Sequence, residues 1–274
     1  MTGAISLPVH RLQGGASTDT RDWVAEEVPV ALEYNGISHA VMLATPLDLP
    51  DFALGFSLSE GLLEGPHELY DIETEVGDLG ITLRLQVSAA AFARLKGRRR
   101  SMAGRTGCGL CGAESLAQVA RVLPLFSGPA RFTQGAVARA MAGLAERQAL
   151  QQRTGAVHAA AWCTADGEVK ILREDVGRHN ALDKLVGALA AAPIDTAAGF
   201  IAITSRASFE MVQKAAMAGV GLLAAVSAPT ALAVSTAQQA GLTLAGFARQ
   251  QGAVVYTHSD RLLPSAAVET DHAH

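Results

Sequence analysis

The alternation of short apolar runs with helical segments in the second half of the chain restricts the possible fold most. Strand-like runs and amphipathic segments follow one another from residue 157 to residue 257. This order is typical of a largely parallel or mixed sheet covered by helices. The expected strands are 157–163, 169–173, 199–204, 221–226, 242–247 and 253–257, and the expected helices are 180–191, 208–218 and 229–240.

The first half of the chain has a different pattern. Two strand-like runs, 28–34 and 37–44, flank Asn35-Gly36, which is a strong two-residue signal for a β-hairpin. Asp48 is a candidate N-cap for a helix that runs through residue 63. Two further extended runs follow at 70–76 and 81–87, with a short helix at 89–96. This part therefore reads as α+β.

The chain has 274 residues, 49% of them hydrophobic, which is enough for two modest domains with buried cores. We expect an α/β protein, with an α+β N-terminal part and a helix-covered mixed sheet at the C-terminus. The expected segments are a flexible tail 1–20, an N-terminal domain 21–97, a mobile cysteine-containing loop with a short helix 98–132, a C-terminal domain 133–264 and a tail 265–274.

Composition excludes several classes of protein. The formal charge of 22 − 26 = −4 gives no reason to expect nucleic-acid binding. The sequence contains no run of about 20 apolar residues, so we expect no membrane span. The first 20 residues lack the basic and apolar regions of a secretory signal. Three cysteines, an odd number, do not make a disulfide framework, and we expect a protein of the reducing cytoplasm.

Two of the cysteines lie in a glycine-rich loop, Gly107-Cys108-Gly109-Leu110-Cys111-Gly112. A thiolate is nucleophilic, and nearby positive charge lowers a thiol pKa. Arg100 and Arg105 are close enough in sequence to supply that charge. The glycines permit backbone shapes that would let the loop turn toward two different partners. The pattern favours sulfur handling by Cys108 and Cys111, and we expect no bound metal.

Three other readings of the cysteine pair stay open. A zinc site needs four ligands, usually two such pairs, and only one pair exists. A thioredoxin-type motif should follow a strand and open a helix, whereas this pair follows a basic glycine-rich stretch. An inert structural pair is also possible, although structural cysteines are usually buried. The third cysteine, Cys163, lies in an apolar strand and is expected to serve in core packing.

Polar side chains follow several of the expected strands, where open α/β sheets bind ligands. Hydroxyls, backbone N–H groups and arginines at helix starts suit phosphate, so these loops could form a polar crevice for a phosphate-rich ligand. The alternative is that they are solvated capping loops without function. Neither common nucleotide fingerprint, GxGxxG or GxxxxGK[ST], is present. The candidate residues are Arg178, His179, Ser205, Arg206, Ser227 and the segment Phe247 to Gly252.

His158 is compatible with the first half of the His-x-Glu signature of zinc deaminases. Position 160 is Ala, and no Pro-Cys-x-x-Cys follows, so deaminase chemistry lacks its proton shuttle and its ligands. We interpret His158 as a structural or ligand-contacting residue.

From about Val28 to Leu262 the chain resembles the FdhD family, the sulfurtransferase accessory proteins of formate dehydrogenase. The resemblance rests on the two-cysteine loop and on several spaced motifs, too many for chance agreement. These motifs are Val157-His158-Ala159-Ala160, Glu174-Asp175-Val176-Gly177-Arg178-His179-Asn180-Ala181-Leu182-Asp183-Lys184, Ser205-Arg206-Ala207-Ser208-Phe209-Glu210-Met211-Val212-Gln213-Lys214 and Val226-Ser227-Ala228-Pro229-Thr230.

The resemblance implies a function. Family members take persulfide sulfur from a cysteine desulfurase and deliver it to the molybdenum bis(molybdopterin guanine dinucleotide) cofactor of formate dehydrogenase. They are usually cytoplasmic homodimers, and their C-terminal part has a cytidine-deaminase-like fold without deaminase chemistry. By position Cys108 would carry the persulfide and Cys111 would assist. The alternative function is a cofactor-binding chaperone without sulfur chemistry.

The resemblance also implies a cofactor-binding segment near the end of the C-terminal domain. Family segments at this place often contain Lys-Pro-Gly, from which this chain departs, although it keeps a basic residue suited to phosphate. The implied contacts are Phe247, Ala248, Arg249, Gln250, Gln251 and Gly252.

Overall fold

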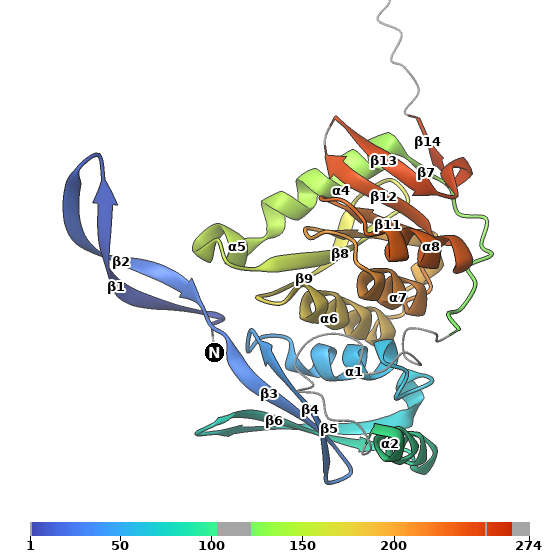
Figure 1. Ribbon diagram of the computed structural model, residues 1–274, viewed down its shortest axis with the longest axis horizontal. Coiled ribbons are helices and arrows are strands. Elements are labelled where there is room, and N and C mark those ends of the chain that lie inside the picture. The colour runs from blue at the N-terminus through green and yellow to red at the C-terminus, as the bar shows by residue number, and fades with distance from the viewer. Residues whose placement is uncertain (1, 103–121, 250, 265–274) are drawn as a thin grey trace, which may run out of the picture.

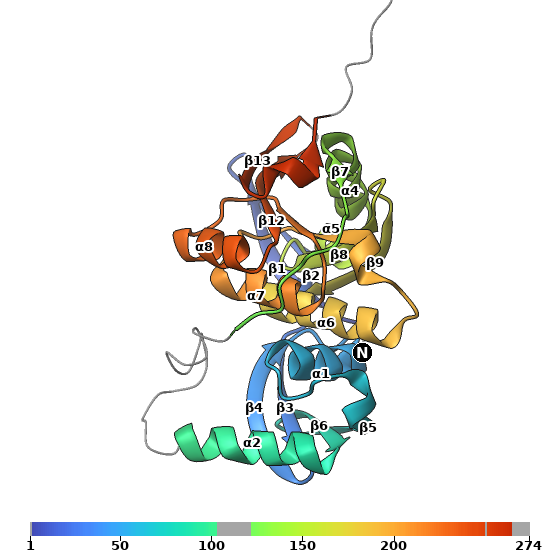
Figure 2. The same ribbon diagram turned by 90° about the vertical axis from the view of Figure 1, so that its right-hand side faces the viewer.

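The computed structural model describes residues 2–102, 122–249 and 251–264, which form two domains and a projecting N-terminal hairpin (Figure 1). The two domains are stacked, and helix α1 of the first lies against helix α6 of the second in both views (Figure 2). The predicted α/β class, with an α+β N-terminal part, is confirmed.

The N-terminal domain is a four-stranded sheet covered by helices. Its strand order is β4-β3-β6-β5, with β3 and β6 parallel. Asn35 and Gly36 have φ of 46° and 82°, so they form the left-handed two-residue turn that the sequence predicts. The elements are β3 Val28–Tyr34, β4 Ile37–Ala44, α1 Leu49–Ser59, the 3₁₀ turn Pro66–Glu68, β5 Leu69–Gly77, β6 Gly80–Val87 and α2 Ala89–Met102.

Two helix expectations in this domain are wrong. Asp48 precedes α1 but has a left-handed backbone, φ 52°, and its side chain caps nothing, while the helix ends at Ser59 instead of residue 63. Helix α2 continues to Met102, past the expected boundary at residue 97. Arginine is a good helix former, so residues 98–100 extend the helix instead of beginning a loop.

The expectation of a flexible tail over residues 1–20 is also wrong. Strands β1 Ala4–Gln13 and β2 Ala16–Ala25 pair antiparallel over ten positions and project from the body of the molecule (Figure 1). Gly14 and Gly15, both with positive φ, make the turn. The available signal was the Gly-Gly pair itself, which indicates a hairpin turn; only the first of the two flanking runs alternates, at Ile5-Ser6-Leu7.

The C-terminal domain is a six-stranded mixed sheet in the order β13-β12-β11-β10-β8-β9. Strands β10, β11 and β12 are parallel, and β8 and β13 are antiparallel to their neighbours. The strands are β8 His158–Thr164, β9 Val169–Asp175, β10 Gly199–Ile203, β11 Leu222–Ala225, β12 Thr243–Arg249 and β13 Gly252–Thr257.

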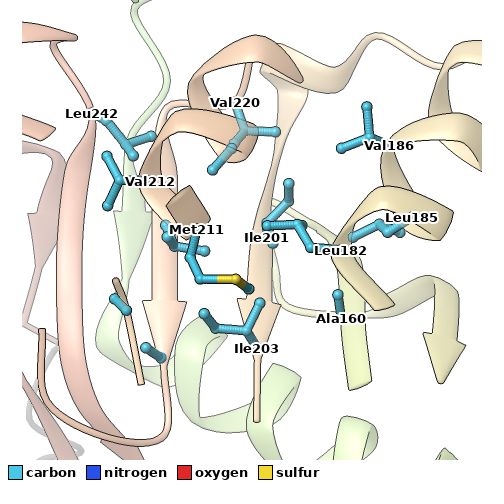
Figure 3. Close-up of a cluster of buried hydrophobic side chains, with 14 of the residues drawn as sticks. Ala160, Leu182, Leu185, Val186, Ile201, Ile203, Met211, Val212, Val220 and Leu242 are labelled. Carbon is cyan, nitrogen blue, oxygen red and sulfur yellow. The ribbon is translucent and has the colours of Figure 1, made fainter. Parts of the chain in front are cut away.

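Helices cover both faces of this sheet, in agreement with the alternation of strands and helices in the sequence. Helices α6, α7 and α8 bury one face, where Met211 and Leu182 meet Ile201 and Ile203 (Figure 3). Helix α4 buries the other face and is capped by Thr133, whose hydroxyl accepts from Ala136 N. The helices are α4 Gln134–Arg147, α5 Ala149–Thr154, α6 Arg178–Ala191, α7 Phe209–Met217 and α8 Ala231–Gln239.

Short elements complete the domain. Strand β7 (Phe132–Thr133) pairs with β14 (Leu262–Leu263), and 3₁₀ turns cover Thr196–Ala198 and Ser259–Arg261.

The two domains meet at a close crossing of α1 and α6. A Cβ on Gly55 would lie 1.7 Å from Asp183 O, and one on Gly187 would lie 1.9 Å from Asp51 O. Only glycine allows helix backbones to approach so closely. Asp51 also pairs with Arg173 at 2.7 Å. These contacts fix the N-terminal domain against helix α6, which begins with the candidate ligand residues Arg178 and His179.

Candidate functional site

The predicted ligand loops all open on one edge of the six-stranded sheet, which we call the carboxyl edge. Strands β10, β11 and β12 run parallel, so their carboxyl ends meet there. Strand β9 is antiparallel to β8, which is antiparallel to β10, so β9 also ends at this edge. His158, the first residue of β8, lies at the same edge. Residues far apart in the sequence are thus brought into one row.

Backbone hydrogen bonds join neighbouring loops along the carboxyl edge. Ala207 N donates to Ala228 O at 3.3 Å, which links the loop after β10 to the loop after β11. Phe247 N donates to Ser227 O, also at 3.3 Å, which links that loop to the end of β12. The three segments that follow β10, β11 and β12 therefore form one continuous surface.

Arg178 and His179 begin helix α6, behind an N-cap glycine that offers no side-chain cap. The Nε of Arg178 and the Nε2 of His179 are buried and make no hydrogen bond within the described residues. The imidazole lies 3.7 Å from Glu210 Oε2, which is beyond hydrogen-bond distance. Two cationic or polar donors without hydrogen-bond partners at a helix start suit an anionic ligand.

Glu210, in the first turn of α7, was missed by sequence reasoning as a site residue. Its pKa is lowered to about 2 by the His179 imidazole and by the hydrogen bond that Ser208 Oγ donates to it at 2.8 Å. The carboxylate therefore stays ionised and holds the imidazole in place. Its position two residues after Ser208, at a helix start, was the available signal.

The serines and arginines of the middle loops differ in accessibility. Ser205 is buried, and its hydroxyl donates to Arg206 O at 3.0 Å, so it shapes the loop. The side chains of Arg206 and Ser227 are exposed at the edge. Of these three residues, Arg206 and Ser227 are available to a ligand.

The segment at the end of β12 carries an unusual backbone. Phe247 has φ of 50°, which is rare for a bulky residue, and its side chain is 46% exposed. The pairing of β12 with β13 shifts register here, and such irregularities re-aim side chains. The strain thus presents an aromatic ring to solvent, and strain of this kind clusters at functional sites.

The remaining residues of this segment are placed differently. Ala248 is buried in the core, so a ligand could reach only its backbone. Arg249 and Gln251 are exposed, and Gly252 pairs with Arg249. Gln250 lies outside the described residues.

The carboxyl edge is long. Strands β9 and β12 are separated by β8, β10 and β11. Four strand spacings amount to about 19 Å. Arg178 and Arg249 therefore cannot grip the same phosphate, and a ligand that contacts both ends must be as long as a dinucleotide.

His158 and Thr204 lie between these ends. Thr204 Oγ1 accepts from Ala159 N at 2.9 Å and is 3.4 Å from His158 Nδ1. Burial lowers the pKa of His158, and the positive charges of Arg178 and His179 lower it further. The ring is therefore neutral at pH 7, which agrees with a structural or ligand-contacting residue.

Much of the 174–184 motif is scaffold. The carboxylate of Glu174 accepts from Leu150 N and Gln151 N, both at 2.9 Å, and so caps α5. Asp175 pairs with Lys184 inside the domain junction, and Asp183 pairs with Lys214 at 2.8 Å. Of the motif's charged residues, Arg178 and His179 are the ones left for a ligand.

Two of the three cysteines, Cys108 and Cys111, lie outside the described residues. Cys163 is fully buried in the core, and burial raises the pKa of its thiol to about 12. Its predicted packing role is confirmed, and its thiol is not a nucleophile at neutral pH.

No helix in the described part of the chain is both long and apolar enough to cross a membrane.

Comparisons of the sequence with known proteins all point to one family. The model of the FdhD/NarQ family matches residues 25–263. The chain is 66% identical over 264 residues to a protein of Variovorax paradoxus named sulfur carrier protein FdhD, covering 95% of each chain. A Cupriavidus necator protein of the same name is 58% identical over 263 residues, covering 96% of this chain and 91% of its own.

Among solved structures, the chain resembles a candidate formate dehydrogenase accessory protein from Desulfotalea psychrophila. The TM-score is 0.74 at 20% identity, with 95% of this chain and 99% of the other covered. At that identity the likeness supports the fold alone.

Proposed function

The chain belongs to the FdhD/NarQ family, and from that premise we propose that it is a sulfurtransferase of molybdenum cofactor maturation. In this proposal it accepts persulfide sulfur from a cysteine desulfurase and passes it to the molybdenum bis(molybdopterin guanine dinucleotide) cofactor required by formate dehydrogenase. The cofactor is the bound substrate. The reaction takes place in the cytoplasm, where the two close cysteines remain reduced.

The observation that carries the proposal is the length and chemistry of the carboxyl edge. Donors without hydrogen-bond partners at Arg178 and His179, an exposed Arg206 and an exposed Arg249 are spread over about 19 Å. A single phosphate would occupy one part of this row. A dinucleotide, with its pyrophosphate and two ring systems, has the length and the negative charge to use it all.

Sulfur transfer proceeds through two exchanges at sulfur. The Cys108 thiolate attacks the outer sulfur of the desulfurase persulfide, so a new S–S bond forms on Cys108 and the desulfurase leaves as its thiolate. Cys111 then attacks the inner sulfur of Cys108. A Cys108–Cys111 disulfide forms, and the outer sulfur departs as hydrosulfide to the cofactor substrate. A cellular dithiol returns the disulfide to thiols.

Mass spectrometry after incubation with a desulfurase and cysteine tests this carrier role. We expect the wild-type chain to gain one sulfur atom and Cys108→Ala to gain none. Cys163→Ala is the matched control, because that thiol is buried with a raised pKa and should leave sulfur loading intact. Full loading of Cys108→Ala would overturn the assignment of Cys108.

A cofactor-binding chaperone without sulfur chemistry is the second candidate. It is favoured by the carboxyl edge, where the described side chains are charged and hydrogen-bonding groups and include no thiol. Complementation separates the two. If Cys108→Ala/Cys111→Ala still matured active formate dehydrogenase, carriage alone would be the better account.

The proposal includes a homodimer. The projecting hairpin supports it, because a two-stranded sheet is marginally stable alone and this one exposes Ile5, Leu7 and Val24 at 44%, 41% and 40%. Analytical ultracentrifugation of the wild-type chain should give twice the monomer mass, and a monomeric species at micromolar concentration would contradict it.

A further inference from the structure

One face of the N-terminal sheet, which we call the open face, is covered by no helix of the described chain. The fully buried residues Val30, Leu32 and Leu83 all point to the opposite face, which packs against α1 and α2. Because side chains alternate along a strand, the residues between them point away from that core. Helix α1 lies between the sheet and helix α6 (Figure 2), so the open face is turned away from the C-terminal domain.

The β4 side of the open face is apolar. Val41 lies opposite Ala31, and Leu43 lies opposite Pro29, in the antiparallel pairing of β3 with β4. The side chains of Val41 and Leu43 are both exposed. Adjacent exposed apolar side chains that are bordered by polar residues are typical of protein interaction sites.

The β5 side of the open face is acidic. Asp71, Glu73 and Glu75 alternate along β5 and are all exposed, and strand pairing places Glu33 and Arg84 on the same face. Arg84 pairs with Glu75 and lies 3.8 Å from Glu33. Asp71 and Glu73 have no ion-pair partner within the described residues. One guanidinium and four carboxylates give this side a formal charge of −3.

This charge limits the kind of partner that can dock on the open face. A second copy of the chain that docked through the same face would bring two acidic surfaces together, which is unfavourable. Nucleic acids and anionic membrane surfaces are repelled for the same reason. The complementary partner is a protein that surrounds an apolar centre with lysine and arginine.

We propose that the open face is the docking surface for the sulfur donor, a cysteine desulfurase, which meets it through a basic surface with an apolar centre. The inference rests on the proposed function, which requires the chain to contact both a donor and an acceptor of sulfur. The carboxyl edge, where the cofactor substrate is bound in that function, lies in the C-terminal domain. A donor on the open face therefore leaves the acceptor's side of the molecule free.

The order of segments in the chain supports this assignment. The segment that carries Cys108 begins after Met102, the last residue of α2, and thus continues from the domain that has the open face. Six residues of chain span at most about 20 Å. An enzyme docked on the N-terminal domain is therefore within reach of Cys108.

Biolayer interferometry with an immobilised full-length desulfurase tests the docking surface on the full chain. We expect the wild type to bind and Glu73→Lys/Glu75→Lys to bind at least about tenfold more weakly, because the two substitutions reverse the charge of the face. Val41→Ser should also weaken binding, since it removes apolar surface from the centre. Wild-type binding should fall at least about tenfold between roughly 0.05 and 0.5 M salt, a test that needs no variant to fold.

Matched controls lie in the C-terminal domain. Glu146→Lys/Asp260→Lys changes the net charge by the same amount at two exposed carboxylates of α4 and the turn after β13. Leu232→Ser removes an apolar side chain from α8 that is 48% exposed, against 47% for Val41. Both controls should bind the desulfurase as the wild type does.

Sulfur loading separates this inference from the proposed function. At limiting desulfurase the open-face variants should gain sulfur at least about tenfold more slowly than their controls, and saturating desulfurase should restore the rate. Equal binding by variants and controls, or no binding by the wild type, would overturn the inference. Loss of binding to apo-formate dehydrogenase instead would assign the face to the acceptor and also overturn it. A wild-type chain that binds through the open face but gains no sulfur would support the docking surface and contradict the proposed function.

Discussion

The Nζ of Lys184 lies 2.7 Å from Oδ2 of Asp175, and both side chains are completely buried. The same ammonium donates to Thr45 O at 2.9 Å, and Thr45 N donates back to Asp175 Oδ2 at 3.0 Å. The segment directly after strand β4 of the first domain is thereby joined to the loop that presents Arg178 and His179. The ion pair thus holds the start of α6 through the domain junction.

Breaking this pair should be costly. Lys184→Met leaves the Asp175 carboxylate buried without its cation, and such a loss typically costs about 3–5 kcal/mol of unfolding free energy. Lys170→Met is the matched control, because its partner Glu168 is exposed and surface pairs contribute roughly 0–1 kcal/mol. Urea denaturation compares the two. Equal destabilisation by both substitutions would contradict the junction role.

The helix crossing makes a second prediction. Gly187→Ala introduces a methyl where Asp51 O lies 1.9 Å away, so α1 and α6 must separate. Overpacking of this kind costs typically about 1–3 kcal/mol, which thermal unfolding would detect. Gly97→Ala in α2 has open space around its Cβ and should be neutral or stabilising by up to about 1 kcal/mol. If Gly187→Ala behaved like Gly97→Ala, the crossing would not be close.

The pKa of Glu210 gives a pH-dependent prediction. Because its folded pKa is lowered from 4.5 to about 2, the carboxylate contributes stability above about pH 4.5, which is lost as the pH falls through 2. His179→Gln should raise that pKa toward 4.5, as carbon NMR of the carboxyl would show. The loss at pH 7 should be under about 1 kcal/mol, because Glu210 is partly exposed. Exposed His67→Gln should leave the titration unchanged.

The N-terminal hairpin offers a fourth prediction. The guanidinium of Arg153 lies 3.3 Å from the centre of the Trp23 ring, a cation–π contact that joins β2 to α5. Arg153→Ala should speed amide hydrogen exchange across residues 4–25 and leave the six-stranded sheet protected. Arg139→Ala, an arginine on α4 that contacts Asp166 O, is the control and should leave hairpin exchange unaltered. Unchanged exchange in Arg153→Ala would show that the hairpin is held elsewhere.

Local patterns were enough to predict the elements whose signals lie within a few residues. The Asn35-Gly36 hairpin and the strands of the C-terminal sheet were predicted correctly, because turn chemistry and hydrophobic period act over short range. The same kind of signal, at Gly14-Gly15, was available for the N-terminal hairpin and was overlooked. The family resemblance identified Cys108 and Cys111 from residue order alone, and their roles stay a prediction.

Long-range contacts decided the rest. That Arg178, Arg206 and Ser227 share one edge depends on strand order and direction, which the loops do not encode locally. The burial of Asp175 and Lys184 at the junction, and the left-handed Phe247, likewise depend on partners up to 139 residues away. Residue types are written in the chain, but which polar groups remain without a partner is decided when distant segments pack.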